Sequence, residues 1–150
     1  MKFYIAAYVE EVERVKTVQK CLEDMGHEIT VDWTSFPGSS RDERDADPEK
    51  PKAIAVRDMQ GVRDCDVFIL LSEPADGRAK YAELGAAIFS AMESKRPKIY
   101  VLGKETNQSV FFYHPTVRRV KTLEAILAEN AENGFTASEH TEKKRNRGLI

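Results

Sequence analysis

Five short stretches of the chain are apolar enough to form strands of a buried β-sheet. The first, "KFYIAAY", is rich in aromatic and β-compatible residues without clean alternation, which suits a strand buried on both faces of a parallel sheet. A second strand is expected at about residues 28–33, within "HEITVDW", and "DVFILL" reads as the central strand. The remaining two are "KIYVLG", residues 98–103, and the short "TVRRV", residues 116–120.

Helical periodicity fills most of the chain between these strands. From Glu10 to Met25 apolar residues recur every three or four positions, and Gly26 follows as a plausible end of the helix. The same spacing predicts a helix between Pro51 and Asp64, a helix from about Tyr81 to Ser94, and a closing helix in "TLEAILAEN". The inward positions are Val12, Val15, Val18 or Gln19, Leu22 and Met25 in the first helix, Ile54 or Ala55, Met59 and Val62 in the second, and Leu84, Ala87 or Ile88, and Ala91 in the third. Residues 34–51, "TSFPGSSRDERDADPEKP", are expected to form a polar loop.

The alternation of strands and helices predicts an α/β fold of three layers. Parallel strands joined by right-handed helical crossovers give a Rossmann-like or flavodoxin-like architecture with a mainly parallel sheet of about five strands. At 150 residues the chain is long enough for one such domain, which we assign to residues 1–130. Residues 131–150 lose the apolar periodicity and end in a basic run, so we expect a flexible tail.

Composition argues against nucleic-acid and membrane partners. The formal net charge is −2, which gives polyanions no overall attraction. The longest dense apolar run, "VFILL", is far shorter than the ~20 residues that cross a bilayer, and acids follow the short apolar stretch at the N-terminus. We therefore expect a cytoplasmic protein. Cys21 and Cys65 have neither a CxxC pattern nor a nearby His, so we expect two buried thiols and no zinc.

The most informative candidate for chemistry is Glu83, in "AKYAELGAAIFSAM". Neither GxGxxG, GxxxxGK[ST] nor GxSxG occurs, so the usual phosphate cradles and the hydrolase elbow are absent from the sequence. Placed in about the first turn of its helix, Glu83 would be kept ionised by the helix dipole and free N–H groups, as a nucleophile requires. The alternative is that this acid only stabilises the helix, by about 0.3–1 kcal/mol.

Several other side chains lie where strands end and have both functional and structural interpretations. Asp58 and Asp66 flank Val62 at four-residue steps, although acids are common at the end of a helix. Trp33 could belong to the core or a pocket wall, or it could form a platform on which a base stacks. His114 in "FFYHP" could contact an anion or lie at the surface, and the aromatic residues before it suit a core or a subunit interface.

Four segments carry a resemblance to a known family. They are "KFYIAAY", "MGHEITVDWT", "RDMQGVRDCDVFILL" and "YAELGAAIFSA", and they keep the order Asp58, Val62, Asp66, central strand, Glu83-Leu84-Gly85. Over residues 2–128 the chain resembles the nucleoside 2-deoxyribosyltransferase-like superfamily, which includes deoxynucleoside 5′-monophosphate N-glycosidases. The resemblance implies a Rossmann-like sheet, a homo-oligomer and a small-molecule nucleoside or nucleotide as substrate.

The same resemblance implies a glutamate nucleophile, which maps onto Glu83, and a supporting acid on the preceding helix, which maps onto Asp58. A carboxylate beneath the sugar can stabilise an oxocarbenium-like transition state and trap the sugar as an ester. A second base as acceptor then gives transfer, whereas water gives hydrolysis. Asp58 is the candidate general acid for the leaving base. This chemistry requires no metal and no cofactor.

The chain also departs from the family's pattern near the expected phosphate. Arg78 and Lys80 precede Glu83 where many transferases are more neutral, and these cations could hold a 5′-phosphate or simply be solvated. The loop "AAYVEE" lacks the Ser/Gly-rich character of the nucleotide hydrolases. We expect the substrate to be bound by Tyr8, Trp33, Gly77, Arg78 and His114. Two alternatives stay open: a catalytically silent nucleotide-binding or sensor module, and a partner-binding protein that uses the aromatic stretch around Phe112.

Overall fold

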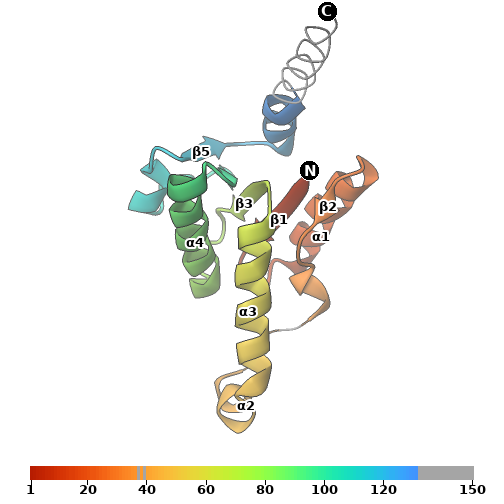
Figure 1. Ribbon diagram of the computed structural model, residues 1–150, viewed down its shortest axis with the longest axis vertical. Coiled ribbons are helices and arrows are strands. Elements are labelled where there is room, and N and C mark those ends of the chain that lie inside the picture. The colour runs from red at the N-terminus through yellow and green to blue at the C-terminus, as the bar shows by residue number, and fades with distance from the viewer. Residues whose placement is uncertain (37, 39, 132–150) are drawn as a thin grey trace, which may run out of the picture.

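The computed structural model describes residues 1–36, 38 and 40–131, and its centre is a sheet of five parallel strands (Figure 1). The strand order is β2-β1-β3-β4-β5, with every neighbouring pair parallel. The strands are β1 (Lys2–Ala6), β2 (Glu28–Ile29), β3 (Val67–Leu71), β4 (Lys98–Leu102) and β5 (Val117–Val120). The predicted α/β, Rossmann-like fold is therefore confirmed. The predicted tail, apart from residue 131, lies outside the described residues.

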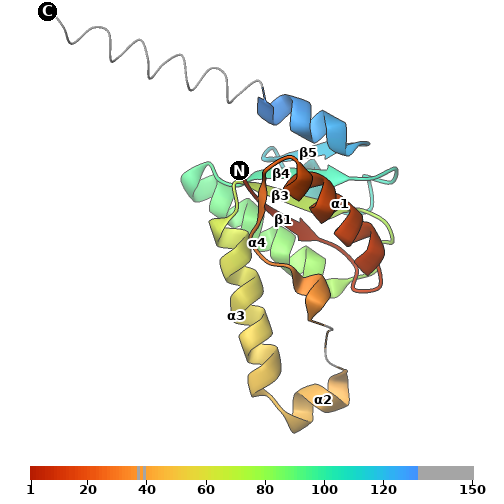
Figure 2. The ribbon, with the colours of Figure 1, turned by 90° about the vertical axis from the view of Figure 1, so that its right-hand side faces the viewer.

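Helices cover both faces of the sheet, which gives the three layers seen in Figure 2. One face packs against α1 (Val12–Asp24) and the helix of residues 123–131, and the other against α3 (Glu49–Asp64) and α4 (Arg78–Ser94). Successive side chains of a strand point to opposite faces. Phe3 and Ile5 of β1 accordingly belong to the α1 side, while Tyr4 and Ala6 belong to the side of α3 and α4.

The segment after α1 differs most from the sequence prediction. β2 ends at Ile29 instead of about Trp33, and a 3-10 helix, η1 (Trp33–Ser35), follows it. The Asp32 carboxylate accepts a hydrogen bond from the Thr34 amide and so turns the chain out of the sheet. The expected loop of residues 34–51 contains α2 (Arg41–Ala46), which begins with a capping box between Ser40 and Glu43.

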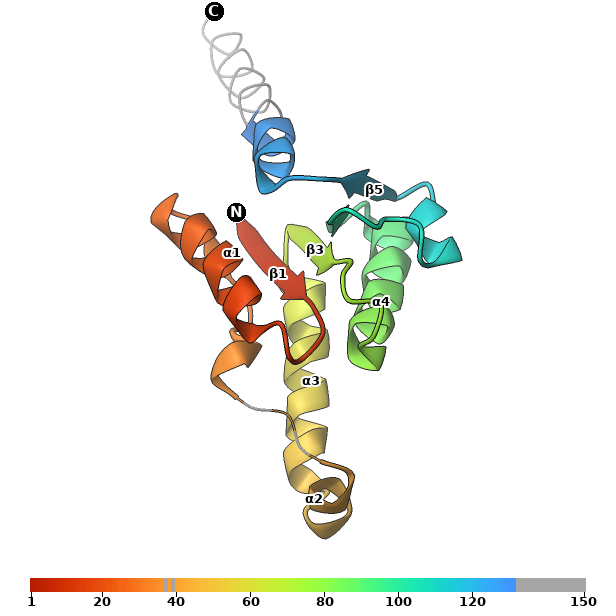
Figure 3. The ribbon, with the colours of Figure 1, turned by 180° about the vertical axis from the view of Figure 1, so that it is seen from behind.

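The apolar stripe of α3 is only partly core. Its buried residues are Gly61 and Val62, and a Cβ added at Gly61 would lie 2.5 Å from a methyl group of Val31. The N-terminal half of the helix extends beyond the sheet, with α2 at its far end (Figure 3). Ile54 and Met59, which the pattern placed in the core, therefore border a cavity instead.

The two cysteines do not share one environment. Cys65 is buried as expected, and burial raises the pKa of its thiol to about 12. Cys21 is exposed, contrary to the prediction, because it falls on the solvent side of α1, whose buried positions are Val15, Gln19 and Leu22. Among the described residues, no helix is both long and apolar enough to cross a membrane.

Candidate active site

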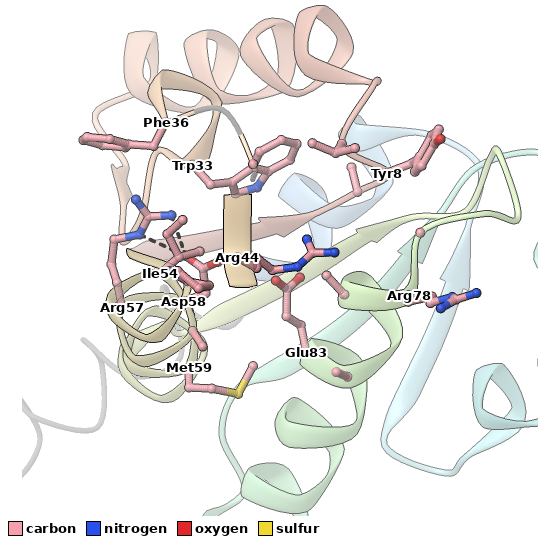
Figure 4. Close-up of a pocket in the computed structure, with 18 residues that line it drawn as sticks. Tyr8, Trp33, Phe36, Arg44, Ile54, Arg57, Asp58, Met59, Arg78 and Glu83 are labelled. Atoms are coloured by element: carbon pink, nitrogen blue, oxygen red, sulfur yellow. Dashed lines mark hydrogen bonds and ion pairs between the residues drawn. The ribbon is translucent and has the colours of Figure 1, made fainter. Parts of the chain in front are cut away.

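A cavity of about 570 Å³ lies where β1 and β3 end, on the side of α3 and α4 (Figure 4). Its walls come from the loop after β1, the segment from η1 to α2, the face of α3, and the start of α4. This volume is typical of a small-molecule site. Six of the seven predicted site residues border it, namely Tyr8, Trp33, Asp58, Gly77, Arg78 and Glu83.

Glu83 belongs to the second turn of α4, because the helix begins at Arg78, three residues earlier than predicted. Gly77 precedes it in a left-handed conformation, with φ of 108°, and directs the chain into the helix. The Glu83 side chain is only 8 % exposed and reaches the cavity. Its Oε1 accepts a hydrogen bond of 3.0 Å from the Tyr4 hydroxyl of β1.

The protonation state of Glu83 is set by burial and not by the helix start. Its pKa is raised from 4.5 to about 7, because desolvation by burial and, to a smaller extent, the charge of Asp58 raise it more than the Tyr4 hydrogen bond lowers it. The expectation that the helix dipole keeps Glu83 ionised is therefore wrong, because the carboxyl lies one turn deeper and away from water. Near neutral pH the group is divided between its acid and its base form.

Tyr4 is a site residue that the sequence analysis missed. Its ring is fully buried and stacks on Phe68, with ring centroids 5.8 Å apart. Burial, followed by the charge of Glu83, raises the pKa of the Tyr4 hydroxyl, so this group remains a donor. The only signal in the sequence was a tyrosine inside a strand that is otherwise apolar, because the partner of its hydroxyl is 79 residues away.

Asp58 faces the cavity from α3 and is held by the residue before it. Arg57 donates from Nε and Nη2 to one carboxylate oxygen of Asp58, at 3.0 and 2.8 Å. The guanidinium of Arg57 in turn lies 4.9 Å from the centroid of the Phe36 ring. This arrangement fixes the Asp58 carboxyl group at the cavity wall.

Aromatic and basic side chains complete the walls. The Trp33 indole donates to the carbonyl oxygen of Ile5 at 2.8 Å, so its ring is fixed beside the end of β1. Arg78 lies at the first position of α4 and points outward, whereas the guanidinium of Arg44 extends from α2 toward the centre of the cavity (Figure 4). Arg44 was missed because the capping box that begins α2 was not recognised in the polar segment.

Two of the expected anion-binding candidates do not reach the cavity. His114 follows a 3-10 helix, η2 (Val110–Tyr113), and its Nδ1 lies 2.9 Å from the hydroxyl of Thr116. It does not border the cavity. Lys80 is completely buried, and its ammonium contacts backbone carbonyls instead of the cavity.

The donor set of the site suits acid–base and nucleophilic chemistry. In the described part of the chain, no cluster of three His, Cys, Asp or Glu residues could hold a metal ion. Two carboxylates, Glu83 and Asp58, face one cavity and are close enough for the charge of one to raise the pKa of the other. A buried carboxylate with a raised pKa beside a cavity is a frequent property of catalytic groups.

Comparison with known proteins extends this description. No protein-family profile and no curated protein sequence matches the chain. Among solved structures it is similar to the CMP N-glycosidase BcmB of Clostridium botulinum, with a TM-score of 0.56 and 19 % sequence identity. The match covers 81 % of this chain and 89 % of that protein. The chain thus shares its α/β fold with that N-glycosidase.

Proposed function

We propose that this protein cleaves the N-glycosidic bond of a nucleoside 5′-monophosphate, with Glu83 as the nucleophile. The observation that carries the proposal is the buried carboxylate of Glu83, which reaches a cavity of substrate size and is oriented by Tyr4. The fold adds support, because a protein of similar structure is a CMP N-glycosidase. A nucleoside monophosphate is also of a size that a cavity of about 570 Å³ can bind.

In the first step, an Oε atom of Glu83 forms a bond to C1′ of the sugar as the bond from C1′ to the base nitrogen breaks. The base leaves with the electron pair of that bond and takes up a proton, for which Asp58 is the nearest candidate acid on α3. A desolvated carboxylate is well suited to this step, since a developing oxocarbenium ion interacts with it more strongly than in water. Water then attacks C1′ and gives up a proton to Asp58, which lost its own proton in the first step, and the bond from C1′ to Glu83 breaks to release the carboxylate and the sugar phosphate.

Arg44 and Arg78 are the residues we propose for the 5′-phosphate. Both border the cavity: Arg44 extends into it from α2, whereas Arg78, at the first position of α4, would have to turn its side chain inward to contact a phosphate. Guanidinium groups bind phosphate through paired N–H donors. The loop after β1 has no Ser/Gly-rich cradle, so a phosphate here must be recognised by other elements. Arginines on two separate helices can take over that role.

The test is base release from a panel of ribo- and deoxyribonucleosides and their 5′-monophosphates, followed by chromatography. We expect release from a monophosphate, with a loss of at least about a thousandfold in Glu83→Gln, as for removal of other catalytic groups. Glu93→Gln is the matched control, since Glu93 is an exposed acid near the end of the same helix. CMP that binds without any base release would contradict the proposal and favour a catalytically silent binding module.

A separate variant tests the proposed contact between Arg44 and the 5′-phosphate. A charged hydrogen bond contributes about 1.5–3 kcal/mol, so Arg44→Met is expected to raise KM for the monophosphate about 10-fold to 100-fold. The KM for the corresponding nucleoside should change little. Arg41→Met, on the same short helix but outside the cavity, is the control. Equal effects of Arg44→Met on nucleotide and nucleoside would contradict a phosphate role.

A further inference from the structure

Lys80 occupies a position that is unfavourable for a lysine in two respects. Its side chain is completely buried, and lysine is almost never fully buried unless it is paired. It also belongs to the first turn of α4, where the helix dipole opposes a positive charge. The residue contributes nothing to the cavity wall directly. A cation in such a place needs specific compensation.

Three backbone carbonyls supply that compensation. The Nζ of Lys80 donates to the carbonyl oxygen of Leu71 at 3.3 Å, to that of Ser72 at 3.1 Å, and to that of Pro74. An ammonium group has three N–H donors, and three acceptors converge on this one. Leu71 is the last residue of the central strand β3, and the other two belong to the turn that follows it.

The charged groups around Lys80 belong to the same turn and to α1. Burial lowers the pKa of its ammonium, while the charges of Asp76 and Glu73 raise it. Arg14 of α1 lowers the pKa, and Glu11, the N-cap residue of α1, raises it. Burial outweighs these acidic groups, so the pKa of Lys80 is lowered overall, and the three carbonyls are needed to hold the ammonium in its charged form.

A second set of contacts holds the other side of this turn. Arg14 of α1 donates to the carbonyl oxygen of Glu73 at 3.2 Å, and the Glu73 carboxylate accepts from the backbone amides of Lys104 and Glu105. The turn is thereby tied to α1 and to the loop after β4. The Lys80 ammonium connects the turn to the last residue of β3 by donating to carbonyl oxygens of both, beneath the start of α4.

The residues that directly follow this turn form part of the cavity wall. Gly77, Arg78 and Ala79 follow it directly and border the cavity. The turn also packs closely on the loop after β1, because a Cβ added at Gly77 would lie only 3.2 Å from the Cα of Tyr8. A shift of the turn would therefore move substrate-binding groups on two loops.

We propose that Lys80 is a positioning residue, whose ammonium fixes the turn between β3 and α4 and thereby the wall formed by residues 77–79. The kinetic consequence of this role rests on the proposed function, whereas its structural consequence does not. Lys80 acts through the turn, since it does not border the cavity and its ammonium donates to backbone carbonyls of β3 and of the turn.

The decisive variant is Lys80→Met, which keeps the length and the apolar stem while it removes the donors. We expect hydrogen exchange of the amides of residues 73–79 to become at least about tenfold faster, with little change in β1 or in the second half of α4. Lys80→Gln, which keeps two N–H donors, is expected to show a smaller increase and serves if Lys80→Met does not fold. The control is Lys20→Met, because the Lys20 side chain is 75 % exposed on α1.

Kinetics separate a positioning role from a purely structural one. In Lys80→Met we expect KM for the 5′-monophosphate to rise about tenfold, while the pH at which kcat is half-maximal stays unchanged, because the contact between Tyr4 and Glu83 is intact. Wild-type exchange in residues 73–79 would overturn the proposal, and so would faster exchange spread evenly over the chain. A shifted pH midpoint would also overturn it, since Lys80 would then act on Glu83.

Failure of the proposed function would be visible separately. If wild-type protein releases no base from any nucleotide, the exchange measurement still decides whether Lys80 holds the turn. In that case calorimetric titration with CMP replaces the kinetics. Weaker CMP binding by Lys80→Met than by Lys20→Met supports the positioning role, and equal binding contradicts it.

Discussion

Burial of an ionisable carboxyl at Glu83 should make the folded protein less stable as the pH rises, and Glu83→Gln should remove that loss. The pKa of Glu83 in the folded protein is about 7, against an ordinary value of 4.5. The folded state therefore binds the proton more tightly than the unfolded state, and stability falls as the pH rises between these two values. At 1.36 kcal/mol for each pH unit, the full cost above pH 7 is roughly 3 kcal/mol.

Urea denaturation at pH 5 and at pH 8, followed by circular dichroism, measures this effect. Glutamine has the shape of glutamic acid and its carbonyl oxygen can still accept from Tyr4. We compare the free energy of unfolding of Glu83→Gln with that of wild type at each pH. The difference should be roughly 2–3 kcal/mol larger, in the direction of a more stable variant, at pH 8 than at pH 5. The exposed Glu93→Gln should show no such difference. An equal effect of Glu83→Gln at both pH values would refute the reasoning.

Two further predictions concern residues behind the cavity. Tyr4→Phe removes the hydrogen bond that lowers the pKa of Glu83, so the pH–rate profile for base release should move about one unit to the alkaline side, and an unmoved midpoint would contradict the contact. Gly61→Ala should lower the free energy of unfolding by about 1–3 kcal/mol, because the new methyl group would overlap Val31. Gly85→Ala, where a Cβ meets nothing within 4 Å, should be neutral or stabilising by up to about 1 kcal/mol. Equal effects of the two alanine substitutions in a thermal melt would argue against the close packing of Gly61 on Val31.

The parallel sheet could be predicted from the sequence because its strands are short runs of apolar residues. Val67–Leu71 is apolar at every position, as a central strand covered on both faces must be, and the helical spacing on either side of it requires crossovers. β2 was overestimated because "ITVDW" alternates like a strand. The turn at Asp32 depends on a local side-chain contact that competes with the sheet.

Most of the predicted site residues border the cavity, but two further residues, Tyr4 and Arg44, were missed. Glu83 and Asp58 could be singled out because their order and spacing around the central strand resemble those of a known family. Tyr4 and Arg44 could not, because Tyr4 of β1 meets Glu83, and Arg44 of α2 meets the cavity, only in the folded chain. The same limit applies to Lys80, whose charge suggested a phosphate contact until its burial was known. Burial, which decides the pKa of Glu83, is a property of the tertiary structure.

The most direct test of the central claim is the stereochemistry of cleavage at C1′. Wild-type protein would be given the nucleoside 5′-monophosphate that it cleaves in buffer containing methanol, and the anomeric configuration of the methyl glycoside would be read by NMR. Two displacements through a Glu83 ester predict that the β configuration of the nucleotide is retained. An inverted product, or retention that persists at the wild-type rate in Glu83→Gln, would contradict Glu83 as the nucleophile.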